Sequence, residues 1–94
     1  MMAPTDQCLW RDVTIVNELG LHLRSATKLA RTADAAEGSV WLEHDDRQAD
    51  AKDAIDILTL GAAQGATLRI RIETPDDAPV LETLVGLVAD GFGE

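Results

Sequence analysis

Residues 67–73, with the sequence TLRIRIE, constrain the fold more than any other stretch of the chain. Their apolar members Leu68, Ile70 and Ile72 alternate strictly with polar and charged residues. Because successive side chains of a β-strand point to opposite faces, this alternation predicts a strand with one buried and one solvent-exposed face. The chain therefore needs a sheet that is covered on one side, and Pro75 predicts where this strand stops.

Two longer segments have the apolar spacing of amphipathic helices that can supply this cover. Residues 23–36 and 78–90 both place apolar side chains three or four positions apart. Gly38 is expected to cap the first helix, and Pro79 suits the first turn of the second. The expected core-facing residues are Leu23, Ala26, Leu29, Ala30 and Ala33 in the first helix, and Val80, Leu81, Leu84, Val85 and Val88 in the second.

Shorter elements complete the pattern. Residues 10–17 and 39–44 are rich in β-branched and apolar residues and predict strands, with Val40 and Leu42 facing the core, and a short strand is expected near 47–49. A short helix is expected over 53–58. The order predicts an α+β fold: a two-layer, open-faced βαββαβα sandwich whose antiparallel sheet is covered by helices on one face. We expect one domain over residues 1–94, with 1–9 as a poorly ordered extension.

Composition excludes several classes of function. The formal net charge of −9 argues against a nucleic-acid binder, which needs a basic face. No apolar run is long enough for membrane insertion, and no secretory signal is visible at the N-terminus. The single cysteine, Cys8, cannot form an internal disulfide, which favours the cytoplasm. His22 and His44 have no partners at ligand spacing, so no metal site is expected.

His22 lies where the first long helix is expected to begin, next to Arg24. Backbone N–H groups are free at a helix start, and the helix dipole there favours a neutral, nucleophilic imidazole. The same N–H groups and the Arg24 guanidinium can hold an anion attached to the ring. The arrangement suits a histidine that takes up and gives away a phosphoryl group. The alternative at this point is a solvated helix-start residue with no chemistry.

Two blocks give a more specific indication. They are GLHLRSA at residues 20–26 and AKDAIDILTLGAAQG at residues 51–65. The first is similar to the GLHxRPA or GLHxRxA block, and the second to the AKS-hydrophobic-LG-QG block, of the HPr family of histidine-containing phosphocarrier proteins. The resemblance covers nearly the whole chain beyond the first ten residues, and the fold of that family agrees with the order of elements expected above.

The resemblance implies a role for each matching residue. His22 would accept a phosphoryl group from enzyme I, on Nδ1 in this family, and pass it to an EIIA-type domain, while Arg24 stabilises the phosphate. Gly20 would permit a tight approach to the helix start. The carrier itself would need no cofactor, since magnesium and phosphoenolpyruvate serve enzyme I, and we expect a monomer. The docking surface for partners would comprise Thr27, Arg31, Ala54, Ile55 and Leu58, although Ile55 and Leu58 suit core packing equally well.

Two positions depart from the family pattern. Ser25 stands where the family commonly has proline, which favours the nitrogen-type branch of the system over a sugar-specific carrier. Asp53 stands at the regulatory serine of some members, where it is either a helix cap or a mimic of phosphoserine. Two further readings stay open: a regulatory module whose docking to a kinase, transporter or transcription factor depends on phosphorylation, and a structural module in which His22 is idle.

Overall fold

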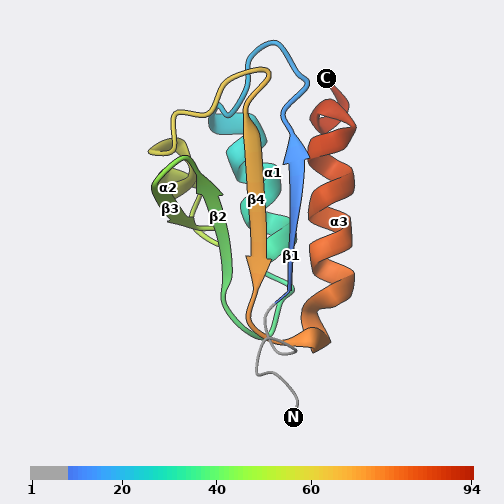
Figure 1. Cartoon of the computed structure of the whole chain (residues 1–94). Helices are drawn as coiled ribbons and strands as arrows, with labels where there is room; N and C mark the ends of the chain where they lie inside the picture. The colour runs from blue at the N-terminus through green and yellow to red at the C-terminus, as the bar shows by residue number, and fades with distance from the viewer. Residues whose placement is uncertain (1–8) are drawn as a thin grey trace.

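The computed structural model describes residues 9–94, which form a four-stranded antiparallel sheet with three α-helices on one side. The strands are β1 (Leu9–Thr14), β2 (Val40–His44), β3 (Arg47–Asp50) and β4 (Thr67–Ile72), and they lie in the order β1-β4-β2-β3. The helices are α1 (Leu23–Ala33), α2 (Ala54–Leu58) and α3 (Ala78–Ala89). Figure 1 shows α1 and α3 running along the sheet, with the end of the chain close to the loop between β1 and α1. The predicted fold is confirmed.

The core lies between the sheet and the helices, as the alternation in residues 67–73 predicts. Leu68, Ile70 and Ile72 of β4 are fully buried, and β1 and β2 flank this strand on either side. The predicted core residues Val40 and Leu42 of β2 are also fully buried. The buried apolar residues contributed by the long helices are Ala26, Leu29, Ala33, Leu81, Leu84 and Val88.

The opposite face of the sheet is open and carries paired charges. Asp12 of β1 lies opposite Arg69 of β4 and accepts two hydrogen bonds from its guanidinium, at 2.8 and 3.2 Å. The same guanidinium lies 3.9 Å from the ring centroid of Trp10. Arg71, on the same strand, pairs with Glu43 of β2 at 3.0 Å. These cross-strand contacts let a sheet with one solvated face stay regular.

The ends of three predicted elements are corrected. Leu9 belongs to β1, so the expected extension over 1–9 cannot include it, and residues 1–8 with Cys8 lie outside the described residues. β1 ends at Thr14 and not at residue 17, because Ile15 bonds the turn before β4 through Ala66 and Gly65. α1 ends at Ala33, where Asp34 is the C-cap.

Gly38 is therefore not the cap of α1. A turn follows α1, in which the Ala36 N–H donates to the Ala33 carbonyl. The backbone N–H groups of Glu37 and Gly38 then donate to the buried carboxylate of Asp77, each at 2.8 Å. The capping prediction failed because a residue far along the chain binds this turn.

The segment after α3 folds back onto the body of the protein. A short 3-10 helix, η3 (Gly91–Gly93), follows α3, and another, η2 (Pro75–Asp77), precedes it. Phe92 is 1% exposed and has a φ of 61°, a left-handed conformation that is uncommon outside glycine. Its burial fixes the path of the chain to Glu94. Among the described residues, no helix is long and apolar enough to cross a membrane.

Candidate functional site

His22 is the N-cap of α1 and is partly exposed. Its backbone is extended, with a φ of −132°, and its carbonyl accepts the first helical hydrogen bond from Ala26 at 2.8 Å. The side chain retains 28% exposure. The imidazole therefore stands at the positive end of an eleven-residue helix, as predicted, and is accessible to another molecule.

The loop before α1 is held by a close backbone contact at Gly20. Gly20 has a φ of +63°, and a Cβ placed there would lie 2.8 Å from both the Ala62 carbonyl oxygen and Ala63 Cα. The Leu21 N–H donates to the same Ala62 oxygen at 3.0 Å. A residue without a side chain is thus required at position 20. The tight approach joins the two sequence blocks that frame the site.

Ser25 connects this loop to the helix start. It is fully buried, and its Oγ accepts a hydrogen bond from the His22 backbone N–H at 2.9 Å. The hydroxyl also lies 3.2 Å from the Gly20 carbonyl and 3.1 Å from the His22 carbonyl. Ser25 and His22 form a capping box, in which the Ser25 backbone N–H faces the His22 side chain. The serine therefore fixes the helix start through hydrogen bonds, where proline would do so by restricting φ.

The ring of His22 is paired with a carboxylate from the other end of the sequence. His22 Nε2 lies 2.6 Å from Glu94 Oε2, and Glu94 Oε1 accepts a hydrogen bond from Asn17 Nδ2 at 3.1 Å. An ionised carboxylate only accepts hydrogen bonds, so this contact places a proton on Nε2. In the neutral ring, the lone pair is then on Nδ1.

The same contacts determine the charge of Glu94. The hydrogen bond with His22 holds the pKa of the Glu94 carboxyl below its ordinary value. Partial burial opposes this shift, while the Asn17 hydrogen bond and the charges of His22 and Lys28 add to it. Glu94 is therefore ionised at neutral pH and remains an acceptor for Nε2.

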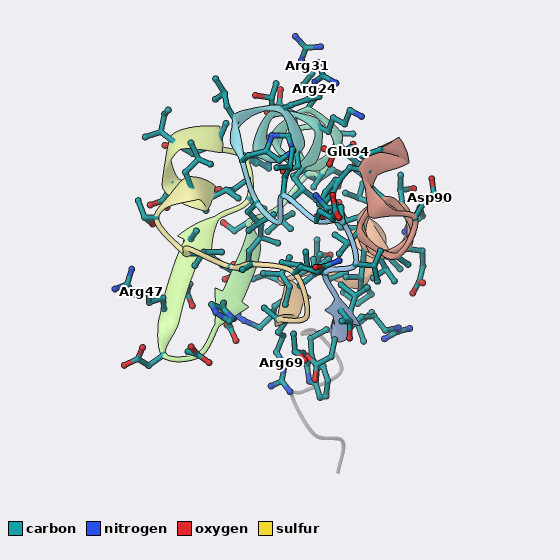
Figure 2. The ribbon with its side chains drawn as sticks, turned by 90° about the horizontal axis from the view of Figure 1, so that it is seen from above. Arg24, Arg31, Arg47, Arg69, Asp90 and Glu94 are labelled. Carbon is teal, nitrogen blue, oxygen red and sulfur yellow. The ribbon has the colours of Figure 1, made fainter. Side chains whose placement is uncertain are left out.

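Two anchors bring Glu94 to this place. Phe92 packs into the core, and its carbonyl accepts a hydrogen bond from Lys28 Nζ of α1 at 2.5 Å. Gly91 adopts a φ of +67° against Val16 and Asn17. In Figure 2, Glu94 lies between α1 and the end of α3. The segment after α3 is thus tied both to α1 and to the loop before it.

Arg24 and Arg31 extend outward from α1 (Figure 2). Both are exposed, and in the part of the chain that the structure describes no carboxylate forms an ion pair with either. Arg24 lies two residues after His22 in the sequence. Lys28, on the same helix, is instead engaged with the carbonyl of Phe92.

The second sequence block forms α2 and its cap. Asp53 is the N-cap, and its Oδ1 accepts hydrogen bonds from the backbone N–H groups of Ile55 at 3.0 Å and Asp56 at 3.2 Å. Asp53 was expected to be either a helix cap or a mimic of phosphoserine, and its hydrogen bonds are those of a helix cap. The charge of the carboxylate is directed at the start of its own helix.

The predicted docking residues divide by burial. Ile55 is 67% exposed, whereas Leu58 and Ala54 are half-buried against the core, and the fully buried residue of α2 is Ile57. On α1, Thr27 is half-buried and its hydroxyl bonds the Leu23 carbonyl at 2.7 Å. Leu23 was predicted to face the core but is 61% exposed, because it lies in the first turn, beyond the cover of the sheet. This correction adds an apolar side chain next to His22.

Asn17 and Glu94 belong to the site, although neither is among the residues predicted for it. The flanking glycines of Gly91-Phe92-Gly93 were the available signal, since a large apolar residue between two flexible ones after a helix suggests a turn that docks. No comparable signal marked Asn17. Residues 9–94 contain no group of three or more His, Cys, Asp or Glu side chains that could hold a metal ion.

Comparisons with known proteins agree with this geometry. A family model described as "PTS HPr component phosphorylation site" matches residues 10–90. The chain is 37% identical over 86 residues to phosphocarrier protein HPr of Cupriavidus necator, covering 92% of this chain and 97% of that protein. It is 34% identical to phosphocarrier protein NPr of Shewanella violacea, over 92% and 94% of the two chains. A crystal structure of HPr from Thermoanaerobacter tengcongensis superimposes with a TM-score of 0.85 at 31% identity, over 92% and 97% of the two chains.

Proposed function

The chain belongs to the HPr family of phosphocarrier proteins, and from that premise we propose that His22 accepts a phosphoryl group from enzyme I and passes it to a histidine of an EIIA-type domain. The observation that carries the proposal is the pairing of His22 Nε2 with Glu94 at 2.6 Å. It occupies one ring nitrogen and leaves the other, at the start of α1, free to attack phosphorus. The protein is then a carrier that is covalently modified between two enzymes.

In the transfer, one N–P bond forms as another breaks. Nδ1 of His22 uses its lone pair to form the new N–P bond, the bond from phosphorus to the donor nitrogen breaks, and the donor imidazole leaves with that electron pair. The ring of His22 keeps its proton on Nε2 and becomes positively charged. Glu94 stabilises this charge, as the carboxylate of a catalytic triad stabilises an imidazolium. Onward transfer reverses these steps.

The transferred group meets two sources of positive potential. Backbone N–H groups at the start of α1 lack partners within the helix and can donate hydrogen bonds to a phosphate there. The exposed Arg24 supplies a full charge that can hydrogen-bond phosphate oxygens. Magnesium and phosphoenolpyruvate are needed by enzyme I, and the carrier requires no cofactor of its own.

The partner proteins dock beside His22 on the exposed parts of α1 and α2. These two helices pack against each other, and their exposed apolar side chains include Leu23 and Ile55. Exposed leucine and isoleucine side chains on a monomer indicate a protein-binding patch when they gather around a reactive group. Arg31 adds charge at the edge of this surface, while Ala54, Leu58 and Thr27 contribute their exposed parts.

The test is phosphoryl labelling with enzyme I, magnesium and phosphoenolpyruvate. The chain is expected to take up acid-labile, base-stable phosphate, and His22→Ala is expected to abolish the labelling. His44→Ala is the matched control, since His44 is the other histidine and lies on β2 near Asp45. Equal labelling of the His22→Ala variant contradicts the proposal.

A second experiment separates the carrier from a regulatory module. The phosphorylated chain is mixed with each EIIA-type domain of its source, and onward transfer is measured. Discharge to such a domain supports the carrier, and the identity of the acceptor assigns the sugar or the nitrogen branch, since relatives with both printed names, HPr and NPr, match the chain. A phosphorylated chain that discharges to none supports a module whose docking depends on phosphorylation.

A further inference from the structure

The amide of Asn17 lies at the junction of the loop before α1 and the segment after α3. Asn17 is 7% exposed, and its Nδ2 donates to the Gly20 carbonyl at 2.9 Å and to Glu94 Oε1 at 3.1 Å. Glu94 in turn uses its other oxygen, Oε2, for His22 Nε2. The three side chains form one continuous chain of hydrogen bonds that ends on the imidazole.

We propose that Asn17 is a positioning residue for phosphoryl transfer: its amide orients Glu94, and Glu94 determines which ring nitrogen of His22 carries the proton. The inference rests on the proposed phosphocarrier function and deepens it. It assigns a role to a residue outside both sequence blocks, five positions before the histidine and 77 positions before the carboxylate that it holds.

The choice of an amide at this position follows from the groups around it. Both of its neighbours, a carbonyl and an ionised carboxylate, only accept hydrogen bonds, and the Nδ2 group has two hydrogens to donate. An aspartate of the same shape would donate none and would repel Glu94. A leucine would fill the space but leave the carboxylate oxygen without its donor.

Asn17 also occupies this place at a cost to stability. Its Oδ1 is buried and has no hydrogen-bond partner within residues 9–94. An acceptor left in this state destabilises a fold, and buried polar groups of this kind are retained where they serve a site. The orientation of the amide is nonetheless unambiguous, because the opposite one would set Oδ1 against two acceptors. The two hydrogen bonds that Nδ2 donates therefore explain why an asparagine occupies this position.

Two routes connect Asn17 to His22, and the experiment must separate them. The first runs through Glu94. The second runs through the Gly20 carbonyl, which Ser25 also contacts at 3.2 Å, and so to the start of α1. A double-mutant cycle with Asn17→Leu and Glu94→Ala distinguishes these routes, because a residue that acts through Glu94 has no further effect once Glu94 is removed.

The readout is the tautomer ratio of His22, obtained from its ring nitrogen chemical shifts at a pH where the ring is neutral. Asn17→Leu is expected to shift the ratio toward the Nδ1–H form about fivefold, the effect of losing one ordinary hydrogen bond. In the Glu94→Ala background the same substitution is expected to produce no further shift. Additive shifts, or an unchanged ratio in Asn17→Leu, overturn the proposal.

A measurement on the unmodified chain keeps the proposal testable if Asn17→Leu does not fold. The Asn17 amide hydrogens, the His22 Nε2 resonance and the Glu94 carboxyl carbon are followed as the pH is lowered, with Lys28 as the other charged group that acts on this carboxylate. A change of the Asn17 amide hydrogens with the same midpoint as the Glu94 carboxyl carbon supports the proposal. An Asn17 amide that does not respond to Glu94 overturns it.

Kinetics with enzyme I then connect positioning to transfer. Asn17→Leu is expected to lower kcat about fivefold with KM unchanged, since the docking surface is untouched. A raised KM with unchanged kcat contradicts the proposal. Because the tautomer measurement needs no phosphoryl donor, a wild-type chain that fails to label refutes the proposed function separately from the positioning of His22.

Discussion

The backbone N–H of Leu21 donates to the carbonyl oxygen of Ala62 at 3.0 Å, and this bond holds the loop before α1 against the turn that follows α2. The preceding residue, Gly20, lies so close to the same turn that a Cβ would come within 2.8 Å of Ala62 O. The contact joins the histidine block to the second block of the family. Any change that separates the two segments displaces His22 as well.

Gly20→Ala is expected to destabilise the protein by about 2–5 kcal/mol, since it combines left-handed backbone strain with a steric clash. Gly61→Ala is the matched control, because Gly61 has the same φ of +63° but open space where its Cβ would be. It is expected to cost about 1 kcal/mol from backbone strain alone. Urea unfolding measures both, and equal losses would show that the contact with Ala62 contributes nothing.

Ser25→Ala is expected to cost about 1–3 kcal/mol, since it removes a fully buried hydroxyl that bonds the His22 N–H. Thr27→Ala is the control within the same helix. Its hydroxyl bonds only the Leu23 carbonyl of its own helix, so a change within about 0.5 kcal/mol is expected. Urea unfolding of the two variants, at one pH, makes the comparison. A Ser25→Ala variant as stable as Thr27→Ala would contradict the proposed fixing of the helix start.

Ile55 and Ile57 provide a matched pair on α2. Ile55→Ala is expected to change stability by less than about 0.5 kcal/mol but to raise KM for phosphorylated enzyme I several-fold, since the side chain is 67% exposed. Ile57→Ala is expected to cost about 2–4 kcal/mol, with KM unchanged while the protein is folded, since that side chain is fully buried. Steady-state phosphorylation measures KM, and urea unfolding measures the free energy of unfolding. An unchanged KM in Ile55→Ala removes this residue from the docking surface.

The ion pair between Asp12 and Arg69 on the open face of the sheet is expected to make the free energy of unfolding depend on pH under acidic conditions. The hydrogen bonds from Arg69 hold the pKa of Asp12 below its ordinary value of 3.8, while burial opposes this shift and the charge of Arg69 adds to it. A lowered folded-state pKa adds stability above the ordinary value and loses it as the pH falls through the folded-state pKa. The stability difference between wild type and Asp12→Asn should therefore be constant at neutral pH and shrink below about pH 4.

Asp46→Asn is the control for that comparison. Asp46 is exposed in the turn between β2 and β3, and in the described part of the chain it forms no ion pair. Its comparison with wild type measures the effect of removing a surface carboxylate that has no arginine partner. A difference for Asp12→Asn that persists unchanged into acid would show that the pair with Arg69 is not formed in solution.

The spacing of apolar residues predicted burial correctly where the geometry of a single strand or helix determines which side chains are buried. The alternating residues of β4 are all buried, and the long helices bury Leu29, Leu81 and Leu84 as expected. The prediction failed at Leu23, because a first-turn residue satisfies the helical period without reaching the core. It also missed Ile57, since a five-residue helix is too short for its spacing to define a buried face.

The candidate site was predictable only as far as it is local in sequence. Gly20, His22, Arg24 and Ser25 lie within six residues, and the geometry of a helix start brings them together. Glu94 reaches His22 because α3 packs on the sheet and Phe92 enters the core. That path depends on tertiary packing, and the Gly91-Phe92-Gly93 sequence indicates a docking turn without indicating what it docks against.

The pairing of His22 with Glu94 closes a loop of 72 residues. Closing so long a loop carries a large entropic cost unless the intervening strands and helices are already in place. A nascent or partly unfolded chain can form the start of α1 from local contacts, but its imidazole lacks the carboxylate that directs its proton. Under the proposed function, the orientation of the His22 ring proton by Glu94 is therefore expected only in the folded protein.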